Sequence, residues 1–222
     1  MMHSRTRIKV CGITTVEDAR EAIRVGVDAL GFIFAEKSPR YISPEKVKEI
    51  VAQLPPFIHL VGVFVDCDPI EVQEIIDYCG LTHVQLHGSE DVEYCQKLAQ
   101  AATPCRLIKA FRVGRKTVAD DFTPYEDSVK GYLLDTYVEG QEGGTGQSFD
   151  WAMIESLRLK LPILLAGGLT VDNVKQAITR IRPFAVDVNS GVEEEPGKKD
   201  HAKLQQFVEL VKCVDQELAS VD

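Results

Sequence analysis

The sequence predicts a single-domain α/β fold, the closed parallel (β/α)8 or TIM barrel, over residues 1–222. Eight apolar segments alternate with helix-like segments, and the apolar segments are mostly continuous runs, as in strands that are covered on both faces. No break in composition divides the chain, and 45% hydrophobic residues are enough for a large core. A doubly wound open sheet has the same alternation and is the alternative.

The first strand lies at the start of the stretch Arg7–Thr14 and ends on Cys11. Side chains alternate along a strand, so Lys9 and Cys11 share one face, and we expect both to point into the barrel. A helix follows over Val16–Ile23, and the threonine pair before it can cap its first turn.

The later elements are predicted from apolar spacing and from turn residues. Ser43 followed by Pro44 marks a helix start, and Asp68 and Gly80 bound another helix. The segment between the fifth and sixth strands contains Pro124 and should form only a short or irregular helix. The expected strands are Ala29–Phe34, Ile58–Val65, His83–Gly88, Arg106–Arg112, Gly131–Thr136, Pro162–Gly168 and Phe184–Gly191, and the expected helices are Ser43–Val51, Asp68–Cys79, Ser89–Leu98, Asp150–Leu159, Val171–Ile178 and Asp200–Val214.

Composition limits the partners of the chain. A formal net charge of -9 and a sequence pI near 5.1 argue against binding to nucleic acid or to an anionic membrane. The start of the chain has no long apolar segment, and no later run reaches the length of a membrane span, so we expect a cytoplasmic protein. The six cysteines contain no CxxC pair, which counts against a zinc ribbon or a dithiol site and favours packed free thiols.

In a barrel of this kind the site forms at the carboxyl ends of the strands. Three late glycine-rich loops lie there, and backbone amides that carry no bulky side chain can cradle phosphate. Each loop could instead be only a tight turn. The candidate phosphate-binding residues are Gly144, Thr145, Gly146, Gly167, Gly168, Asn189, Ser190 and Gly191.

Three further residues at these strand ends could carry chemistry. Asp135 ends the sixth strand and could act as a general acid if apolar walls raise its pKa, or it could hold a structural partner. Cys11 could act as a general base if nearby cations lower its pKa, or it could be a small buried residue. Arg40, after the second strand, could bind a substrate carboxylate or be a solvated surface residue.

Two charges are expected one pleat below the site. Lys9 and Asp187 both point into the barrel, and a buried charge needs a partner, so we predict that the two are ion-paired beneath Cys11. Gln85 and His87 on the fourth strand are expected to contact the ligand. They share a face with His83, and the histidines are interpreted as hydrogen-bonding or packing residues, not as metal ligands.

Taken together, a series of motifs in the order of the chain resembles phosphoribosylanthranilate isomerase of tryptophan biosynthesis, and the resemblance extends almost from end to end. The motif at Cys11 and the motif at the eighth strand are each fairly specific. The segments that carry the resemblance are Lys9–Thr14, Gly31–Phe34, Ser38–Ile42, Gly62–Val65, Val84–Gly88, Leu134–Thr136, Gly143–Gly146, Ala166–Leu169 and Asp187–Glu193.

The resemblance implies an Amadori rearrangement of N-(5-phosphoribosyl)anthranilate to 1-(o-carboxyphenylamino)-1-deoxyribulose 5-phosphate, without a metal or an organic cofactor. It implies that Asp135 is the general acid, that Cys11 is the general base and that Arg40 binds the anthranilate carboxylate. The late glycine loops correspond to the phosphate cradle. Asn189 stands where serine is often expected, which leaves open the precise set of phosphate donors.

Two kinds of rival remain. The first is another phosphosugar barrel enzyme. An indole-glycerol-phosphate synthase would need a catalytic set of lysine and glutamate, and a ribulose-phosphate epimerase would need a metal site of paired His and Asp. A catalytically silent phosphosugar-binding regulator would keep the phosphate loops and tolerate loss of Cys11 or Asp135, and both are present.

Overall fold

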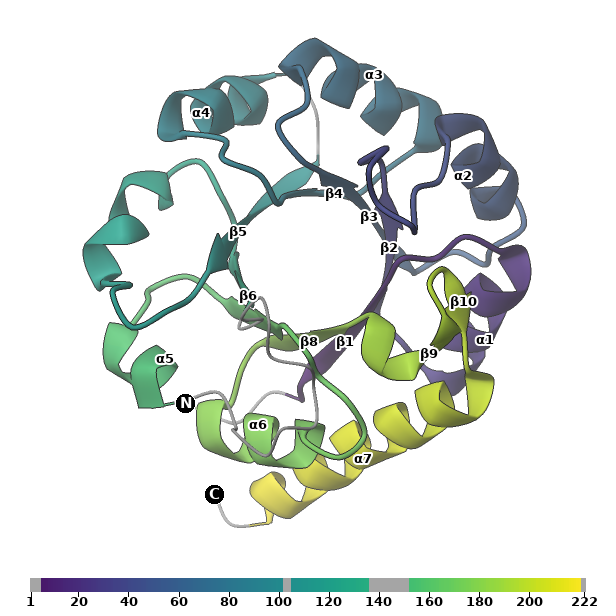
Figure 1. Cartoon of the computed structure of the whole chain (residues 1–222), viewed down its shortest axis with the longest axis vertical. Helices are drawn as coiled ribbons and strands as arrows, with labels where there is room; N and C mark the ends of the chain where they lie inside the picture. Colours follow the sequence, from purple (N-terminus) through teal and green to yellow (C-terminus); the bar gives the residue numbers. More distant parts are fainter. Residues whose placement is uncertain (1–4, 102–104, 136–151, 221–222) are drawn as a thin grey trace.

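The computed structural model describes residues 5–101, 105–135 and 152–220. Its parallel strands form a closed barrel in which each strand pairs with the next along the chain and β8 pairs with β1 (Figure 1). The predicted barrel is confirmed, and the open-sheet alternative is wrong, because an open sheet would leave its two edge strands unpaired. The barrel strands are β1 (Arg7–Cys11), β2 (Ala29–Ile33), β3 (His59–Phe64), β4 (His83–Leu86), β5 (Arg106–Arg112), β6 (Tyr132–Asp135), β7 (Ile163–Ala166) and β8 (Ala185–Val188).

Helices surround the strands on the outside of the barrel (Figure 1). Between β5 and β6 the described chain forms only two 3-10 turns, η1 and η2, as expected for the segment that contains Pro124. The helices are α1 (Val16–Val25), α2 (Pro44–Val51), α3 (Pro69–Cys79), α4 (Val92–Gln100), α5 (Ala152–Leu157), α6 (Val174–Ile181) and α7 (His201–Ala219), and the 3-10 turns are η1 (Ala119–Asp121), η2 (Thr123–Tyr125) and η3 (Ser190–Val192).

The predicted caps of α2 and α3 are confirmed. The side chain of Ser43 accepts a hydrogen bond from a first-turn amide of α2, and Pro44 is the first residue of that helix. Asp68 caps α3 in the same way, and Gly80 ends α3 in the left-handed conformation with φ of 67°.

Two predicted helix starts are wrong. The helix predicted from Ser89 begins at Val92 with Asp91 as its N-cap, because Glu90 turns into the protein and pairs there with Lys109. The helix predicted from Val171 begins three residues later. Before it, side chains and backbone amides of residues 170–173 hydrogen-bond one another, which offers the backbone an alternative to the helix.

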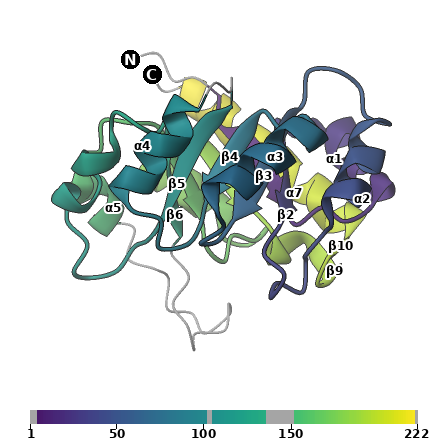
Figure 2. The ribbon, with the colours of Figure 1, turned by 90° about the horizontal axis from the view of Figure 1, so that it is seen from above.

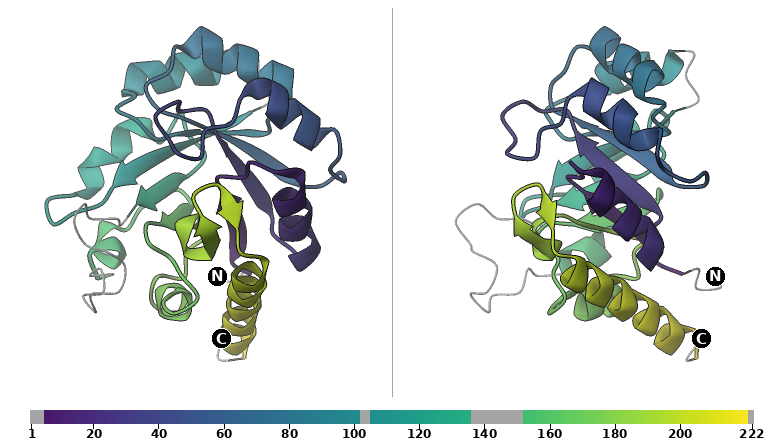
Figure 3. Two further views of the ribbon diagram at one scale, coloured as in Figure 1. Left: turned by 45° about the vertical axis from the view of Figure 1, so that its right-hand side comes forward. Right: turned by 90° about the vertical axis from the view of Figure 1, so that its right-hand side faces the viewer.

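A short antiparallel hairpin, which the sequence did not predict, follows η3. It consists of β9 (Glu193–Glu195) and β10 (Lys198–Lys199). The hairpin lies at the end of the barrel toward which the strands run (Figure 2). From it, α7 runs back along the outside of the barrel and packs against α1 and α6 (Figure 3). This helix extends five residues beyond its predicted end at Val214.

The core has two parts. The larger one fills the space between the strands and the surrounding helices. The smaller one lies inside the barrel and forms an apolar layer made by Ile108, Ala110, Leu133, Leu164, Ala166 and Ala185. The interior of the barrel is therefore packed by side chains, and polar groups at the strand ends are presented above an apolar layer.

All six cysteines are free, as predicted. Cys79 and Cys95 are buried in the core, whereas Cys67 and Cys105 are half-buried outside the regular elements. Cys213 is exposed on α7, so the prediction that each of these thiols is packed is wrong for this residue. None of the helices in residues 5–101, 105–135 and 152–220 has both the length and the apolar composition of a membrane-spanning segment.

Candidate active site

Cys11 ends β1 inside the barrel, directly above an ion pair. In the β1–β8 register Lys9 lies opposite Asp187, and its Nζ donates to Asp187 Oδ2 at 2.8 Å. Both side chains are buried, so the predicted ion pair is present. Gly31 on β2 leaves space for the side chains of Cys11 and Lys9, because a Cβ at Gly31 would lie 2.9 Å from Cys11 Sγ and 3.0 Å from Lys9 Nζ.

Burial dominates the acidity of the Cys11 thiol. Burial raises its pKa and Asp187 raises it further, while Lys9 and Lys199 lower it, and the pKa remains above the ordinary value for cysteine. The expected cations are therefore present, but they do not outweigh desolvation. Burial also opposes the charge of Lys9, yet Asp187 and Cys11 keep its pKa raised, so Lys9 is a cation.

Asp135 is the last residue of β6 and shares its strand face with Leu133 of the interior layer. Its Oδ2 lies 3.3 Å from His87 Nε2, and His87 Nδ1 lies 2.9 Å from Gln85 Nε2. β4 ends at Leu86, so His87 begins the following loop and points back to β6. The structure therefore brings the predicted acid and two predicted ligand contacts into one hydrogen-bonded row.

His83 lies apart from this row, because it starts β4 at the opposite end of the strand. Its ring packs edge-on against His59 with the centroids 4.8 Å apart. Burial, with His59 and Arg106, lowers the pKa of His83 to about 4, so the ring is neutral at pH 7. The interpretation of His83 as a packing residue is confirmed.

Arg40 reaches the site from the loop after β2. Its guanidinium donates to the carboxylate of Glu193, with Nε 2.9 Å from Oε1 and Nη2 2.7 Å from Oε2. A Cβ at Gly12 would lie 2.9 Å from Arg40 Cδ and 2.8 Å from Asn189 Oδ1. Arg40 and Asn189 therefore meet over the backbone that follows Cys11, and Arg40 is not a solvated surface residue.

The glycine loops after β7 and β8 lie against each other. Gly167 and Gly168 have φ of 89° and 67°, which favours glycine at both positions. Gly191 is the second residue of the turn η3, and a Cβ on Gly191 would lie only 1.9 Å from the carbonyl oxygen of Leu169. Two of the three predicted phosphate loops are thus adjacent. The third, with Gly144, Thr145 and Gly146, lies outside the described residues.

Sequence reasoning missed two charged residues of the hairpin. Glu193 accepts from Arg40, and it also pairs with Lys199, whose Nζ lies 2.8 Å from Glu193 Oε1 and 3.0 Å from Asn189 Oδ1. Both side chains are almost completely buried. The signal was a Pro196-Gly197 turn flanked by glutamates and lysines, which is typical of a hairpin.

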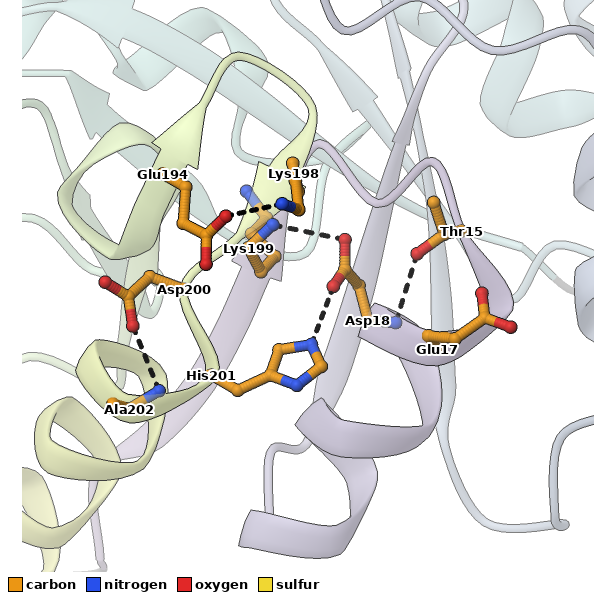
Figure 4. A pocket seen from close by; sticks show the side chains of 9 residues that line it. All are labelled: Thr15, Glu17, Asp18, Glu194, Lys198, Lys199, Asp200, His201 and Ala202. Carbon is orange, nitrogen blue, oxygen red and sulfur yellow. Dashed lines mark hydrogen bonds and ion pairs between the residues drawn. The ribbon is translucent and has the colours of Figure 1, made fainter.

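An open pocket lies outside the barrel, between the hairpin and the first turns of α1 and α7 (Figure 4). Asp18 is at its centre and accepts hydrogen bonds from the backbone amide of Lys199 and from the ring of His201. None of the residues predicted for the site lines this pocket. Among the described residues, no three His, Cys, Asp or Glu side chains form a group that could hold a metal ion.

The family model for N-(5'-phosphoribosyl)anthranilate (PRA) isomerase matches residues 8–210. The chain belongs to this family. N-(5'-Phosphoribosyl)anthranilate isomerase of Geotalea uraniireducens is 50% identical over 207 residues, which cover 93% of this chain and 98% of that protein. The resemblance inferred from the motifs is confirmed.

Two solved structures of PRA isomerases share the fold. The crystal structure of phosphoribosyl anthranilate isomerase from Thermotoga maritima has a TM-score of 0.85 and 43% identity, and the match covers 94% of this chain and 99% of that one. A second crystal structure, a complex with reduced 1-(o-carboxyphenylamino)-1-deoxyribulose 5-phosphate, has a TM-score of 0.82 and 41% identity with the same coverage. Both chains are matched over almost their full length.

Proposed function

We propose that this chain is an N-(5'-phosphoribosyl)anthranilate isomerase, which converts its substrate to 1-(o-carboxyphenylamino)-1-deoxyribulose 5-phosphate in tryptophan biosynthesis. Membership of the family over almost the whole chain supports this assignment. In chemical terms, the assignment rests on two proton-transfer groups, Cys11 and Asp135. They lie at the carboxyl ends of β1 and β6, and both occupy interior-facing positions of one closed barrel.

Asp135 is the proposed general acid. It donates a proton to the ring oxygen of the ribose, the bond from that oxygen to C1' breaks, and the electrons of the anthranilate nitrogen form a cationic Schiff base. His87 is within hydrogen-bond distance of Asp135, and Gln85 holds the far side of the His87 ring. We place both side chains against the substrate, where they orient the acid toward the sugar.

Cys11 is the proposed general base, which removes the C2' proton to give an enolamine that tautomerises to the ketone. The raised pKa of Cys11 in the free protein means that its thiol must be ionised when the substrate is bound. The cationic Schiff base adds a positive charge to those of Lys9 and Lys199 and so stabilises the thiolate after ring opening. In this order of events, the thiol of the free enzyme stays neutral until the substrate is bound.

Binding groups surround these two residues. Arg40 binds the anthranilate carboxylate, for which a planar guanidinium is well suited. The loops with Gly167 and Gly168 and with Asn189, Ser190 and Gly191 hold the phosphate. The glycine loop at Gly144, Thr145 and Gly146, outside the described residues, is proposed as the third part of the phosphate cradle.

We further propose that residues 1–222 act as one barrel domain on this small-molecule substrate in the cytoplasm. Six free thiols, of which Cys213 is exposed, support a reducing compartment.

The assignment is tested by following the disappearance of N-(5'-phosphoribosyl)anthranilate with purified protein beside Cys11→Ala and Asp135→Ala. Each variant should fold and bind inorganic phosphate but lose at least about a hundredfold in kcat, the usual effect of removing a proton-transfer group. Cys79→Ala is the matched control and should keep its turnover, because Cys79 is a buried thiol in the last turn of α3, outside the barrel interior. Full activity of Cys11→Ala or Asp135→Ala would remove that residue from the mechanism.

A further inference from the structure

The hairpin β9–β10 carries two buried charges, and the proposed reaction gives no role to one of them, Glu193. The side chains of Glu193 and Lys199 are 4% and 0% exposed, and their charged atoms lie 2.8 Å apart. The same Glu193 carboxylate binds the guanidinium of Arg40. We propose that Glu193, backed by Lys199, is a positioning residue that presents Arg40 to the carboxylate of the substrate. This inference rests on the proposed function, in which Arg40 binds that carboxylate.

The geometry of the guanidinium supports this role. Arginine has five N–H donors in a rigid plane, and Glu193 occupies the edge formed by Nε and Nη2 of Arg40. Within the part of the chain that the structure describes, Nη1 of Arg40 makes no hydrogen bond, and the side chain is 19% exposed. The edge formed by Nη1 and Nη2 can therefore bind a second carboxylate through two parallel hydrogen bonds.

Lys199 makes this arrangement electrostatically favourable. Burial raises the pKa of Glu193, but Arg40 and Lys199 lower it more, so Glu193 is ionised. An isolated pair of Arg40 and Glu193 would be neutral and would attract an anion poorly. Burial lowers the pKa of Lys199, and the hydrogen bond to Glu193 opposes this shift. Protonated Lys199 supplies a second cation, so two positive charges and one negative charge leave one positive charge for the incoming carboxylate.

The backbone of the hairpin is tied to α1 and to the loop between β1 and α1, which holds these charges in place. Asp18 of α1 accepts a hydrogen bond from the amide of Lys199 at 3.1 Å and lies 2.8 Å from His201 Nε2. Figure 4 shows Asp18 between these two partners. The hydroxyl of Thr14 donates to the carbonyl of Gly197 in the hairpin turn. The ammonium of Lys199 is thereby directed inward, to Glu193.

The same network reaches the strand end that carries Cys11. Lys199 Nζ lies 3.0 Å from Asn189 Oδ1, and the stem of Arg40 passes over Gly12, the residue after Cys11. A guanidinium released from Glu193 would have several rotamers in this space. The substrate carboxylate would then have to order it, at a cost in binding free energy.

Steady-state kinetics with Glu193→Gln test the proposal. The amide keeps the shape but removes the charge and one acceptor that hold the guanidinium of Arg40. Loss of this order should outweigh the gain in net positive charge, so KM should rise about tenfold, the value of one hydrogen bond to a charged group, while kcat changes much less. Glu194→Gln is the matched control, since Glu194 is a half-exposed neighbour that pairs with Lys198, and its KM should be unchanged. An unchanged KM in Glu193→Gln would overturn the proposal.

Ligand binding separates positioning from a general structural role. Two probes are used: reduced 1-(o-carboxyphenylamino)-1-deoxyribulose 5-phosphate and the same compound without the carboxyl group. Glu193→Gln should lose about tenfold in affinity for the first probe and keep its affinity for the second. An equal loss for both probes would mean that Glu193 only supports the fold, and would overturn the proposal.

A replacement variant and the turnover of the wild-type protein distinguish the possible outcomes. If Glu193→Gln does not fold, Glu193→Asp replaces it, because aspartate keeps the charge but withdraws the carboxylate from Arg40, and the same selective loss is expected. Wild-type protein without turnover of N-(5'-phosphoribosyl)anthranilate would overturn the proposed function itself. Normal wild-type turnover with no probe selectivity in either Glu193 variant would overturn only the role of Glu193.

Discussion

The buried pair of Lys9 and Asp187 sets the electrostatic conditions under Cys11. The two charges act on the thiol with opposite sign, so their effects partly cancel and burial decides the direction of its pKa shift. Asp187 depends on Lys9, because among the described residues its second oxygen, Oδ1, is buried without a hydrogen-bond partner. A buried pair of this kind is therefore more sensitive to the loss of one partner than to the loss of both.

We therefore predict that Lys9→Met lowers the free energy of unfolding by about 3–5 kcal/mol, because it leaves the Asp187 carboxylate buried and uncompensated. The double variant Lys9→Met with Asp187→Leu should recover most of this loss. Urea denaturation at pH 7 measures both. A single variant that is as stable as the wild type would contradict the structural role of the pair.

At the scale of single elements, two positions are occupied by glycine for different physical reasons. Gly80 ends α3 with φ of 67°, and a Cβ built there would meet nothing within 4 Å. Gly191 lies in η3, where a Cβ would lie 1.9 Å from a backbone carbonyl oxygen of the loop after β7. The first position restricts only the conformation of the backbone, whereas the second controls how closely two loops of the site approach.

Gly80→Ala should therefore lower the free energy of unfolding by only about 1–2 kcal/mol, because an alanine is strained in the left-handed conformation. Turnover should be unchanged. Gly191→Ala should cost more than Gly80→Ala and weaken binding of inorganic phosphate, because the backbone contact cannot be relieved unless the loops separate. Chemical denaturation and phosphate titration of the two variants make the comparison. Equal stability and equal phosphate affinity would show that the contact of the two loops is unimportant.

At the scale of the whole molecule, the barrel closes where its first and last strands pair, and α7 covers this region. The helix packs against α1 and α6, which flank β1 and β8 along the chain (Figure 3). Its inner face consists of completely or almost completely buried side chains, including Phe207. Since a closed barrel has no edge strands, loss of packing at the seam should affect the structure as one unit.

Phe207→Ala should lower the free energy of unfolding by about 3–5 kcal/mol, the usual cost of removing a buried phenylalanine side chain. Gln206→Ala, at the exposed neighbouring position on the same helix, should be within about 0.5 kcal/mol of the wild type. Urea denaturation followed by far-UV and near-UV circular dichroism measures both the size and the cooperativity. Separate transitions for the two signals would contradict closure as a single cooperative unit.

The sequence by itself determined the order of the elements, the closed barrel, the caps of α2 and α3 and the pairing of Lys9 with Asp187. The elements and caps depend on local periodicity and on turn residues, which act over a few residues. The alternation of strands and helices predicts the barrel. Inside a barrel, side-chain alternation places the buried charges of Lys9 and Asp187 on the same inner surface, where each needs a partner.

Only the tertiary structure decided the partner of Arg40, the inward turn of Glu90 and the direction of the Cys11 pKa shift. Arg40 and Glu193 are 153 residues apart in the chain, and their contact exists only because closure of the barrel brings the loop after β2 beside the hairpin after β8. Burial is likewise a property of the assembled fold. The balance between desolvation and neighbouring charge therefore cannot be obtained from the order of residues alone.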